Sequence, residues 1–263
     1  MGVLTAINLE ELNSLFKAYN FTNITPTSDG IMDTTYIVSN SEKSFILKKY
    51  ERDMGEKIQR DAELLEGLNA VGLNVPLLLD SSSGWYLYKK LSGMQPRVIK
   101  SYHIQALARF MAKFHHQTYK RKTDTIFTKN YELKKILSFT KKNFYIYYKK
   151  LQAIEQYKAK NDGFIHGDIF KDNTVFNGTK IGVFDFIDGG SGEFIFDIAV
   201  ALVAFDAKKH PLFISLFLNT YNQKAPKKIE KEKLIEMMEL ASKFYALLRI
   251  DKYKNPKKAK ELL

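Results

Sequence analysis

The most informative segment of the chain is Phe164-Ile165-His166-Gly167-Asp168-Ile169-Phe170-Lys171-Asp172-Asn173, whose polar residues follow the pattern His-x-Asp-x-x-x-x-Asn. Two short strands, 174–176 and 181–186, are expected directly after it. They are joined by Asn177-Gly178, a dipeptide that is typical of tight β-hairpins. Because a hairpin reverses the chain, we expect it to bring Asp185, at the end of its second strand, back toward Asn173.

These polar side chains have the chemistry that phosphoryl transfer requires. The reaction needs a carboxylate that accepts the proton of the attacking hydroxyl, and oxygen ligands for the magnesium ion that bridges the phosphates. The spacing matches the catalytic loop of kinases, in which the aspartate accepts the proton. Asp168 is therefore predicted to be the catalytic base, and Asn173 and Asp185 are predicted to bind Mg2+. His166 is expected to organise the loop through hydrogen bonds.

A purely structural interpretation of the same residues is also available. Aspartate and asparagine beside glycine are ordinary turn formers, so each residue taken alone is compatible with local capping. The set as a whole favours function, because Asp185 lies within the apolar run 183–187. A carboxylate buried in such a run costs free energy unless it is paired or bound to a metal.

A lysine on a predicted strand is the candidate phosphate contact. The apolar segment Phe45-Ile46-Leu47-Lys48 resembles the kinase strand whose lysine contacts the α and β phosphates. Lys49 is expected on the opposite face of the strand, so only Lys48 is assigned to the nucleotide, although an edge-strand solubility role remains the alternative. In the following predicted helix, 56–70, either Asp61 or Glu63 could pair with Lys48.

Other titratable residues are expected to have structural roles. Asp197 opens an apolar helix, where it could cap the N-terminus or pair with a buried base. Asp188 could face the phosphates or begin the loop at Gly189-Gly190. His115 and His116, at the end of a predicted helix, are interpreted as packing and surface residues, because no acidic residue stands at metal-ligand spacing from them.

Hydrophobic periodicity predicts an α+β fold with two lobes. Residues 1–91 are expected to form a small, β-rich, nucleotide-binding lobe, and residues 92–263 a mostly helical catalytic and substrate lobe. In the first lobe the expected elements are a helix at 9–19, a helix at 56–70, and strands at 35–38, 44–50, 75–79 and 85–91. The helices expected in the second lobe span 102–117, 131–158, 211–222 and 229–250.

Composition restricts the classes of protein that fit. The 263 residues contain no cysteine, which excludes disulfides and thiolate metal sites, and is typical of a reducing cytoplasm. No apolar run is long enough to cross a bilayer, so no membrane association is expected. The formal net charge of +12 would attract nucleic acid, but no nucleic-acid-binding motif accompanies the lysines. Solvated helix faces are the favoured explanation, and no nucleic-acid partner is expected.

Nearly the whole chain resembles the aminoglycoside phosphotransferase and choline kinase superfamily, which has the protein-kinase-like fold. Within it, the chain looks most like bacterial homoserine kinases of the kinase-like type. That likeness depends on the segment 166–173, in particular Phe170 and Asp172, and on the later matches Asp185-Phe186 and Phe196-Asp197-Ile198-Ala199-Val200. By offset from Gly72, Asp61 matches the position of a glutamate in the aminoglycoside phosphotransferases.

The resemblance implies a phosphotransferase that moves the γ-phosphate of ATP, with Mg2+, to the side-chain hydroxyl of homoserine. Choline, ethanolamine, an aminoglycoside or a sugar are alternative acceptors that would use the same catalytic residues. A homoserine pocket needs a cation for the acceptor carboxylate, and the lysine excess argues against a polycationic aminoglycoside. An alternative of another class is a catalytically inactive basic binding protein built on the same scaffold, against which the complete set Asp168, Asn173 and Asp185 argues.

Overall fold

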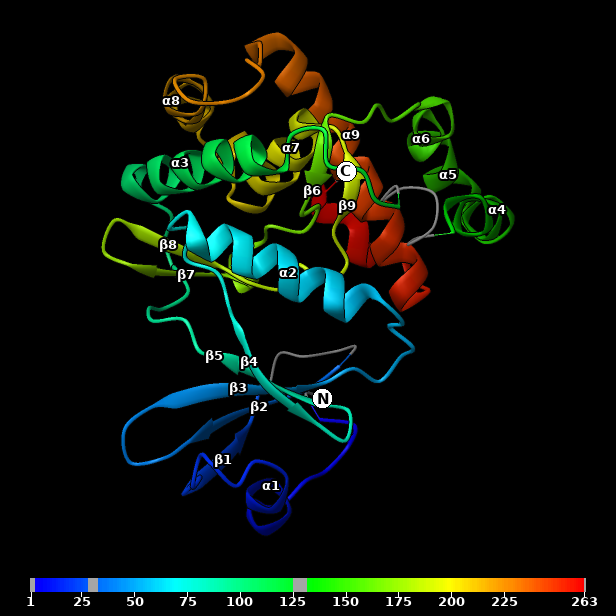
Figure 1. The fold of residues 1–263 in the computed structure, drawn as a ribbon. Helices are drawn as coiled ribbons and strands as arrows, with labels where there is room; N and C mark the ends of the chain where they lie inside the picture. Colours follow the sequence, from blue (N-terminus) through cyan, green and yellow to red (C-terminus); the bar gives the residue numbers. More distant parts are fainter. Residues whose placement is uncertain (1–2, 28–32, 125–131, 263) are drawn as a thin grey trace. The chain divides into compact units, whose positions relative to one another are not determined.

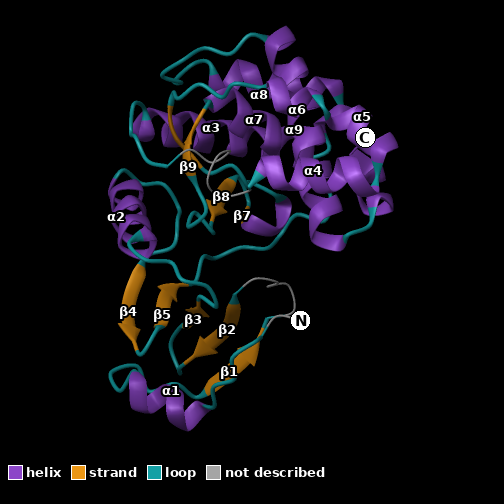
Figure 2. Ribbon diagram, turned by 90° about the vertical axis from the view of Figure 1, so that its right-hand side faces the viewer, coloured by secondary structure: helices purple, strands orange, loops and turns teal. Residues whose placement is uncertain are grey.

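The computed structural model describes residues 3–27, 33–124 and 132–262, and the chain divides into two compact units, residues 1–92 and 93–263 (Figure 1). The division falls between Ser92 and Gly93, one residue from the expected lobe boundary. The first unit holds a β-sheet with two helices and the second unit is mostly helical (Figure 2). The expected α+β class is therefore confirmed.

The first unit is built on a five-stranded antiparallel sheet with the strand order β1-β2-β3-β5-β4. Its strands are β1 (Asn23–Pro26), β2 (Thr34–Ser39), β3 (Ser44–Lys49), β4 (Leu78–Ser82) and β5 (Trp85–Lys89). Strand β1 was not predicted, because its four residues are mostly exposed and end in a proline, which occurs in sheets mainly at edges.

One face of this sheet is covered by the helix α1 (Leu9–Leu15), as both ribbon views show (Figures 1 and 2). The alternation of β3 places Phe45 and Leu47 on this face, where they join a buried cluster with Leu12 and Phe16. Helix α1 is shorter than expected. It begins with a capping box at Asn8 and ends at Leu15, before an aromatic turn.

The second helix of this unit, α2 (Lys57–Ala70), buries Leu64, Leu65 and Leu68 and, unusually for a helix face, Asp61. It ends at Ala70, and Gly72 just beyond it has a φ of +78°, the left-handed conformation that commonly follows a helix. The predicted helix and its stop signal are thus confirmed.

The second unit contains the apolar helix α7 (Phe194–Ala204), of which eight residues are buried. The long helix α9 (Lys231–Tyr253) runs against α7 in both views (Figures 1 and 2) and brings Phe244 to within 5.5 Å of Phe196, measured between ring centroids. The other helices are α3 (Ser101–Thr118), α4 (Leu133–Asn143), α5 (Tyr145–Leu151), α6 (Ala153–Gln156) and α8 (Pro211–Tyr221), with short 3-10 turns η1 (Lys171–Asn173), η2 (Ala207–Lys209) and η3 (Pro256–Leu262).

The prediction of a single helix over 131–158 is wrong. The structure has three helices there, α4, α5 and α6. The helical conformation is first interrupted at Phe144, whose ψ of 55° is not helical. The aromatic and β-branched residues from Phe144 to Tyr148 have weak helix propensity, and this favours a break at that point. Tyr131, where the helix was expected to begin, lies outside the described residues.

Two small two-stranded sheets lie among these helices. One pairs β6 (Gly163–Ile165) with β9 (Gly190–Gly192), and the other pairs β7 (Thr174–Asn177) with β8 (Lys180–Val183). The hairpin predicted from Asn177-Gly178 is β7–β8, and its positive φ at Gly178 is the conformation that glycine permits. In the described part of the chain, no helix combines the length and the apolar character needed to cross a membrane.

Candidate active site

The loop between β6 and the 3-10 turn η1 carries Asp168 and ends at Asn173. The side-chain amide of Asn173 donates to the backbone oxygen of Asp168 at 2.9 Å and to its carboxylate Oδ2 at 3.0 Å. Both amide hydrogens of Asn173 can therefore serve the loop, which leaves its Oδ1 atom as an oxygen donor for another ligand. The loop thus joins two of the three predicted residues by direct hydrogen bonds.

The β7–β8 hairpin returns the chain to Asn173, as expected. Thr174 pairs with Val183, and the backbone N–H of Phe184 donates to the carbonyl of Asn173 at 3.1 Å. Asp185 is the next residue, so the hairpin register sets it beside Asn173. Strand β8 ends at Val183, three residues earlier than predicted.

Asp185 differs from the expectation of a carboxylate buried in an apolar run. Its neighbours Val183, Phe186 and Ile187 are buried, but Asp185 has a φ of +69° and is exposed. The left-handed conformation is uncommon for residues other than glycine, although aspartate adopts it more readily than most. The carboxylate is therefore accessible to a ligand on the surface of the second unit.

The environment of Asp168 makes its ionisation unusual. The pKa of the Asp168 carboxyl is raised to about 7, mainly by burial and in addition by the negative charges of Asp185 and Asp172. Hydrogen bonds from Tyr245 and Asn173 oppose the increase in pKa. A cation bound beside Asp185 would counteract the repulsion between these carboxylates.

Asp197, at the start of α7, fixes the backbone of the loop. Its carboxylate is fully buried and accepts hydrogen bonds from the backbone N–H groups of His166 at 3.2 Å and Gly167 at 2.7 Å. The structural role expected for Asp197 is confirmed, and the groups that it satisfies belong to the loop rather than to its own helix. Gly167 has a φ of +74°, a conformation that glycine adopts without strain.

His166 makes the organising contacts that were expected of it. Its Nε2 atom lies 3.0 Å from the carbonyl oxygen of Phe184, and its Nδ1 atom accepts a hydrogen bond from the backbone N–H of Asp168 at 3.2 Å. The ring packs against Phe186 at a centroid distance of 4.5 Å. His166 therefore links the loop to the chain that leaves the hairpin.

His115 was expected to be a packing residue with no acidic partner in ligand spacing, and the structure gives it an acidic partner from a distant segment. The residue is fully buried, with its Nε2 atom 2.9 Å from Oδ2 of Asp197 and its Nδ1 atom 2.8 Å from the hydroxyl of Tyr221. It also stacks on Phe194. The sequence could not show this partnership, because 82 residues separate His115 from Asp197. His116 is exposed, as expected for a surface residue.

Tyr245, on α9, was missed by the sequence analysis. Its hydroxyl donates to the carbonyl oxygen of Gly167 and lies 3.2 Å from Oδ1 of Asp168. Its ring lies 4.8 Å from the ring of Phe170, measured between centroids. A tyrosine in a long helix gives no local signal that it reaches a loop 77 residues away.

The oxygen donors present fit Mg2+ better than a transition metal. Carboxylate and amide oxygens, here from Asp185 and Asn173, are the ligands that this hard cation prefers. Within residues 3–27, 33–124 and 132–262, no group of three or more His, Cys, Asp or Glu side chains could hold a metal ion. Two oxygen donors of this kind suit an ion that takes its remaining ligands from phosphate and water, as Mg2+ commonly does in nucleotide-dependent enzymes.

Lys48 lies in the first unit, on the sheet face opposite α1. Its Nζ atom is 3.8 Å from Oδ2 of Asp33 and 5.0 Å from the ring centroid of Tyr50. Lys49 instead lies over the ring of Trp85, a member of the α1-facing cluster. The two lysines thus point to opposite faces, as the strand alternation predicted.

The structure separates the two acids considered as partners of Lys48. Asp61 is 4% exposed, whereas Glu63 is exposed and accepts a hydrogen bond from Gln59 on its own helix. Burial is the largest of the causes that raise the pKa of the Tyr88 hydroxyl. The charge of Asp61 also raises this pKa, whereas the charge of Lys48 lowers it. Asp61 and Lys48 therefore both lie within electrostatic reach of one hydroxyl, and Asp61 is the better candidate.

Asp188 is half-buried just before Gly189, whose backbone N–H donates to the carbonyl of Phe186. This turn is compatible with a structural role for Asp188 at the start of the loop.

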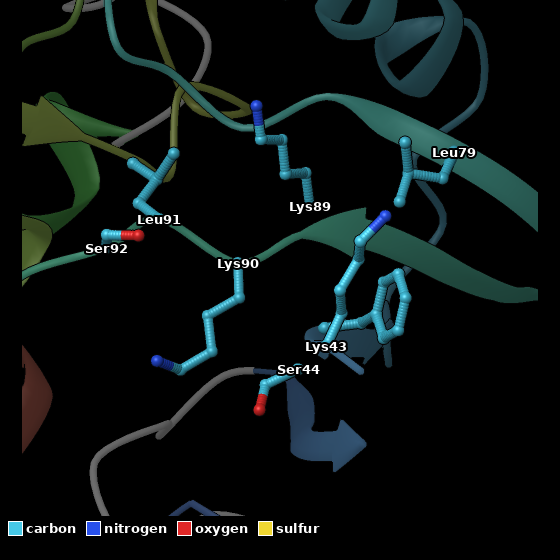
Figure 3. Close-up of a pocket in the computed structure, with 8 residues that line it drawn as sticks. Lys43, Ser44, Leu79, Lys89, Lys90, Leu91 and Ser92 are labelled. Atoms are coloured by element: carbon cyan, nitrogen blue, oxygen red, sulfur yellow. The ribbon is translucent and has the colours of Figure 1, made fainter. Parts of the chain in front are cut away.

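A pocket of about 670 Å³ lies in the first unit, around the end of β5 (Figure 3). Lys89 and Lys90 extend from the strand in opposite directions (Figure 3). The remaining lining residues are Lys43, Ser44, Phe45, Leu79, Leu91 and Ser92. The pocket contains none of the predicted site residues, so the chemistry assigned above is not located in it.

Comparisons with known proteins show which family the chain resembles. The model of the phosphotransferase enzyme family matches residues 23–231. A homoserine kinase of Polaromonas naphthalenivorans is 24% identical over 228 residues, which cover 77% of this chain and 72% of that protein. A homoserine kinase of Methylobacillus flagellatus is 22% identical and covers 86% of this chain and 79% of its own length.

Solved structures with a similar fold include an amicoumacin kinase in complex with AMP-PNP and Ca2+. Its TM-score is 0.73 and its sequence identity is 17%, and the match covers 97% of this chain and 91% of the amicoumacin kinase chain. An ADP-bound aminoglycoside phosphotransferase has a TM-score of 0.65 and 19% identity over 97% of both chains. These likenesses confirm the expected kinase-like fold. Since the family model spans well over half of the sequence, including every predicted catalytic and metal-binding residue, the chain belongs to the phosphotransferase enzyme family and is an enzyme that transfers phosphate to a hydroxyl group.

Proposed function

We propose that this protein is an ATP- and Mg2+-dependent kinase that phosphorylates the side-chain hydroxyl of L-homoserine. The curated relatives that match it are homoserine kinases, although at 21–24% identity. The similar solved structures include complexes with AMP-PNP, ADP and ATP, and this supports ATP as the phosphate donor.

The observation that carries the proposal is the arrangement around Asp168. Its carboxylate is held by the amide of Asn173 at 3.0 Å, while the hairpin register sets Asp185 beside Asn173. A turn that served only local capping would not need two carboxylates whose repulsion helps to raise the pKa of Asp168 to about 7. Such an arrangement is useful where a proton must be accepted near a bound cation.

In this proposal, Asp168 orients the acceptor hydroxyl and accepts its proton. Asn173, through Oδ1, and Asp185, through its exposed carboxylate, would hold Mg2+. The ion would neutralise charge on the phosphates and fix the γ-phosphate for an in-line displacement. The hydrogen bonds that Asn173 gives to Asp168 tie the position of the base to that of the metal ligand.

The first unit would contribute Lys48, which we assign to the α and β phosphates, and Asp61, which we assign to the pairing of Lys48. The support is that both residues lie near Tyr88 and that Lys48 belongs to the face of the sheet not covered by α1. Tyr50 and Tyr88 join the same face through a hydrogen bond of 3.0 Å between their hydroxyl groups.

The charge of the chain favours an acceptor that carries a carboxylate over a polycationic one. There are 41 lysine and arginine residues against 29 aspartate and glutamate residues. An aminoglycoside pocket would require clustered acids to neutralise several ammonium groups, whereas homoserine presents one carboxylate to a cation. Choline, ethanolamine, an aminoglycoside and a sugar remain the acceptors against which homoserine must be compared.

The test is magnesium-dependent ATP turnover by the purified protein with each of these acceptors, with Asp168→Asn as the control. We expect stimulation by homoserine, abolished in the variant. Stimulation by another alcohol would retain the mechanism and replace the substrate. Absence of turnover with every acceptor, together with absence of ATP binding, would support the inactive basic scaffold and refute the proposal.

A further inference from the structure

We propose that Tyr245 of α9 is a positioning residue for the catalytic base, an inference that rests on the proposed role of Asp168. Its hydroxyl reaches two groups of the loop, the carbonyl oxygen of Gly167 and the carboxylate Oδ1 of Asp168 at 3.2 Å. Nothing in the sequence pattern of the loop requires a contact from the last long helix of the chain.

Tyr245 completes a set of contacts that fixes the carboxylate of Asp168. Asn173 donates to Oδ2 from the C-terminal side of the loop, and Tyr245 lies at Oδ1 from another element. One contact at each oxygen restricts rotation of the carboxylate about its bond to Cβ. Because an ionised carboxylate offers about four lone-pair sites, an oxygen lone pair remains for the incoming hydroxyl.

Tyr245 also holds the peptide that precedes the base. The N–H of Gly167 is bound by Asp197 at 2.7 Å, and the carbonyl of the same residue is bound by Tyr245. Gly167 has no side chain with which to resist a change in its backbone angles, and its φ is +74°. The two bonds therefore replace the stiffness that glycine lacks.

The ring of Tyr245 is itself held in place by the loop. Phe170 follows Asp168 by two residues and lies 4.8 Å from Tyr245 between ring centroids. On the other side, Phe244 lies 5.3 Å from Tyr245, and packs against Phe196 of α7. A half-buried tyrosine with aromatic neighbours and two hydroxyl contacts has little freedom to leave the base.

The decisive variant is Tyr245→Phe, which removes the hydroxyl and retains the ring. We expect the single-turnover rate of phosphoryl transfer to fall about tenfold, equivalent to about 1.4 kcal/mol, while the KM for ATP is unchanged. Tyr253→Phe is the matched control, because Tyr253 lies on the same helix but is 49% exposed, and it should leave the rate unchanged.

A double-mutant cycle separates positioning of the base from general support of the fold. In the Asp168→Asn background no base remains to be positioned, so Tyr245→Phe should lower the residual rate by less than twofold. An equal tenfold loss in both backgrounds, or an unchanged rate in the single variant, would overturn the inference. Asp168→Asn alone tests the proposed function, so failure of the two ideas can be distinguished.

Phe170→Leu provides a second route to the same question. It preserves the Tyr245 hydroxyl but removes the ring that orients it, and we expect a threefold to fivefold lower rate. The effect should disappear in the Tyr245→Phe background, because the oriented hydroxyl is then absent. Persistence of the full effect in that background would show that Phe170 does not act through Tyr245, and this would contradict the inference.

Discussion

Asp197→Asn is expected to destabilise the second unit strongly, even though it changes the side-chain volume very little. The carboxylate accepts three buried hydrogen bonds, from the backbone N–H groups of His166 and Gly167 and from the ring of His115. An amide has one oxygen, so its NH2 group must face at least one of the N–H donors that the second carboxylate oxygen now satisfies.

The magnitude follows from these contacts. Losing a hydrogen bond to a charged group costs about 1.5–3 kcal/mol, and leaving a buried donor unsatisfied costs about 1–3 kcal/mol. We therefore expect a loss of about 3–5 kcal/mol in the free energy of unfolding. For a unit of this size each kcal/mol lowers the Tm by about 2–4 °C, so the Tm should fall by roughly 6–20 °C. The turnover rate should fall as well, because Gly167 precedes the base.

The assay is thermal unfolding of the full chain by calorimetry, with Asp251→Asn as the matched control. Asp251 also bears a basic partner, Lys254 at 2.5 Å, but its side chain is 35% exposed, and such a pair contributes about 0–1 kcal/mol. If Asp197→Asn shifted the Tm no more than Asp251→Asn, the claim that this carboxylate fixes the loop would be refuted.

Three further perturbations test other parts of the structure. Lys48→Met should lower kcat/KM for ATP on the order of 10²-fold, whereas Lys49→Met, on the opposite face, should leave it within about twofold, measured by steady-state turnover. Gly163→Ala should lower the free energy of unfolding by about 3 kcal/mol or more, because its Cβ would lie 2.2 Å from the backbone oxygen of Thr118. Its control, Gly67→Ala on α2, places the new Cβ in open space and should raise the free energy of unfolding by roughly 0.5–1 kcal/mol, with both values measured by urea unfolding. ATP at 100 times its Kd should stabilise by about 2.7 kcal/mol in thermal unfolding, and chelation of Mg2+ should remove most of that gain; an equal gain with EDTA would contradict the metal site.

Local signals in the sequence predicted the parts of this fold that depend on neighbouring residues. Asn177-Gly178 located the β7–β8 hairpin because only a few conformations join two strands in two residues. The stop signal of α2 at Gly72 is equally local. The exposure of Asp185 was not predicted, because apolar neighbours suggest burial, whereas the side-chain direction depends on a single backbone angle of +69°.

Contacts between distant segments could not be predicted in the same way. His115 and Asp197 are separated by 82 residues, and Tyr245 and Asp168 by 77, so no periodicity or spacing relates them. What brings each pair together is the packing of apolar helices, which specifies neighbours by shape rather than by a motif. Sequence reasoning therefore anticipated the structural roles of His166 and Asp197. It missed two contacts that only tertiary packing creates, His115 with Asp197 and Tyr245 with Asp168.

The packing of α7 on α9 explains how the fold holds the loop. On α7, Phe196 precedes Asp197, and on α9, Phe244 precedes Tyr245. The two phenylalanines lie 5.5 Å apart between ring centroids and join the helices, while the two polar residues that follow them bind opposite ends of the Gly167 residue. Because each loop contact is one residue from a core contact, a shift of either helix would move the N–H or the carbonyl of Gly167, and with it the base. The hydrophobic core of the second unit therefore sets the position of this loop. Because Asp168 is the proposed base, we expect a core variant that loosens this pair to lower the phosphoryl-transfer rate without touching a reacting atom.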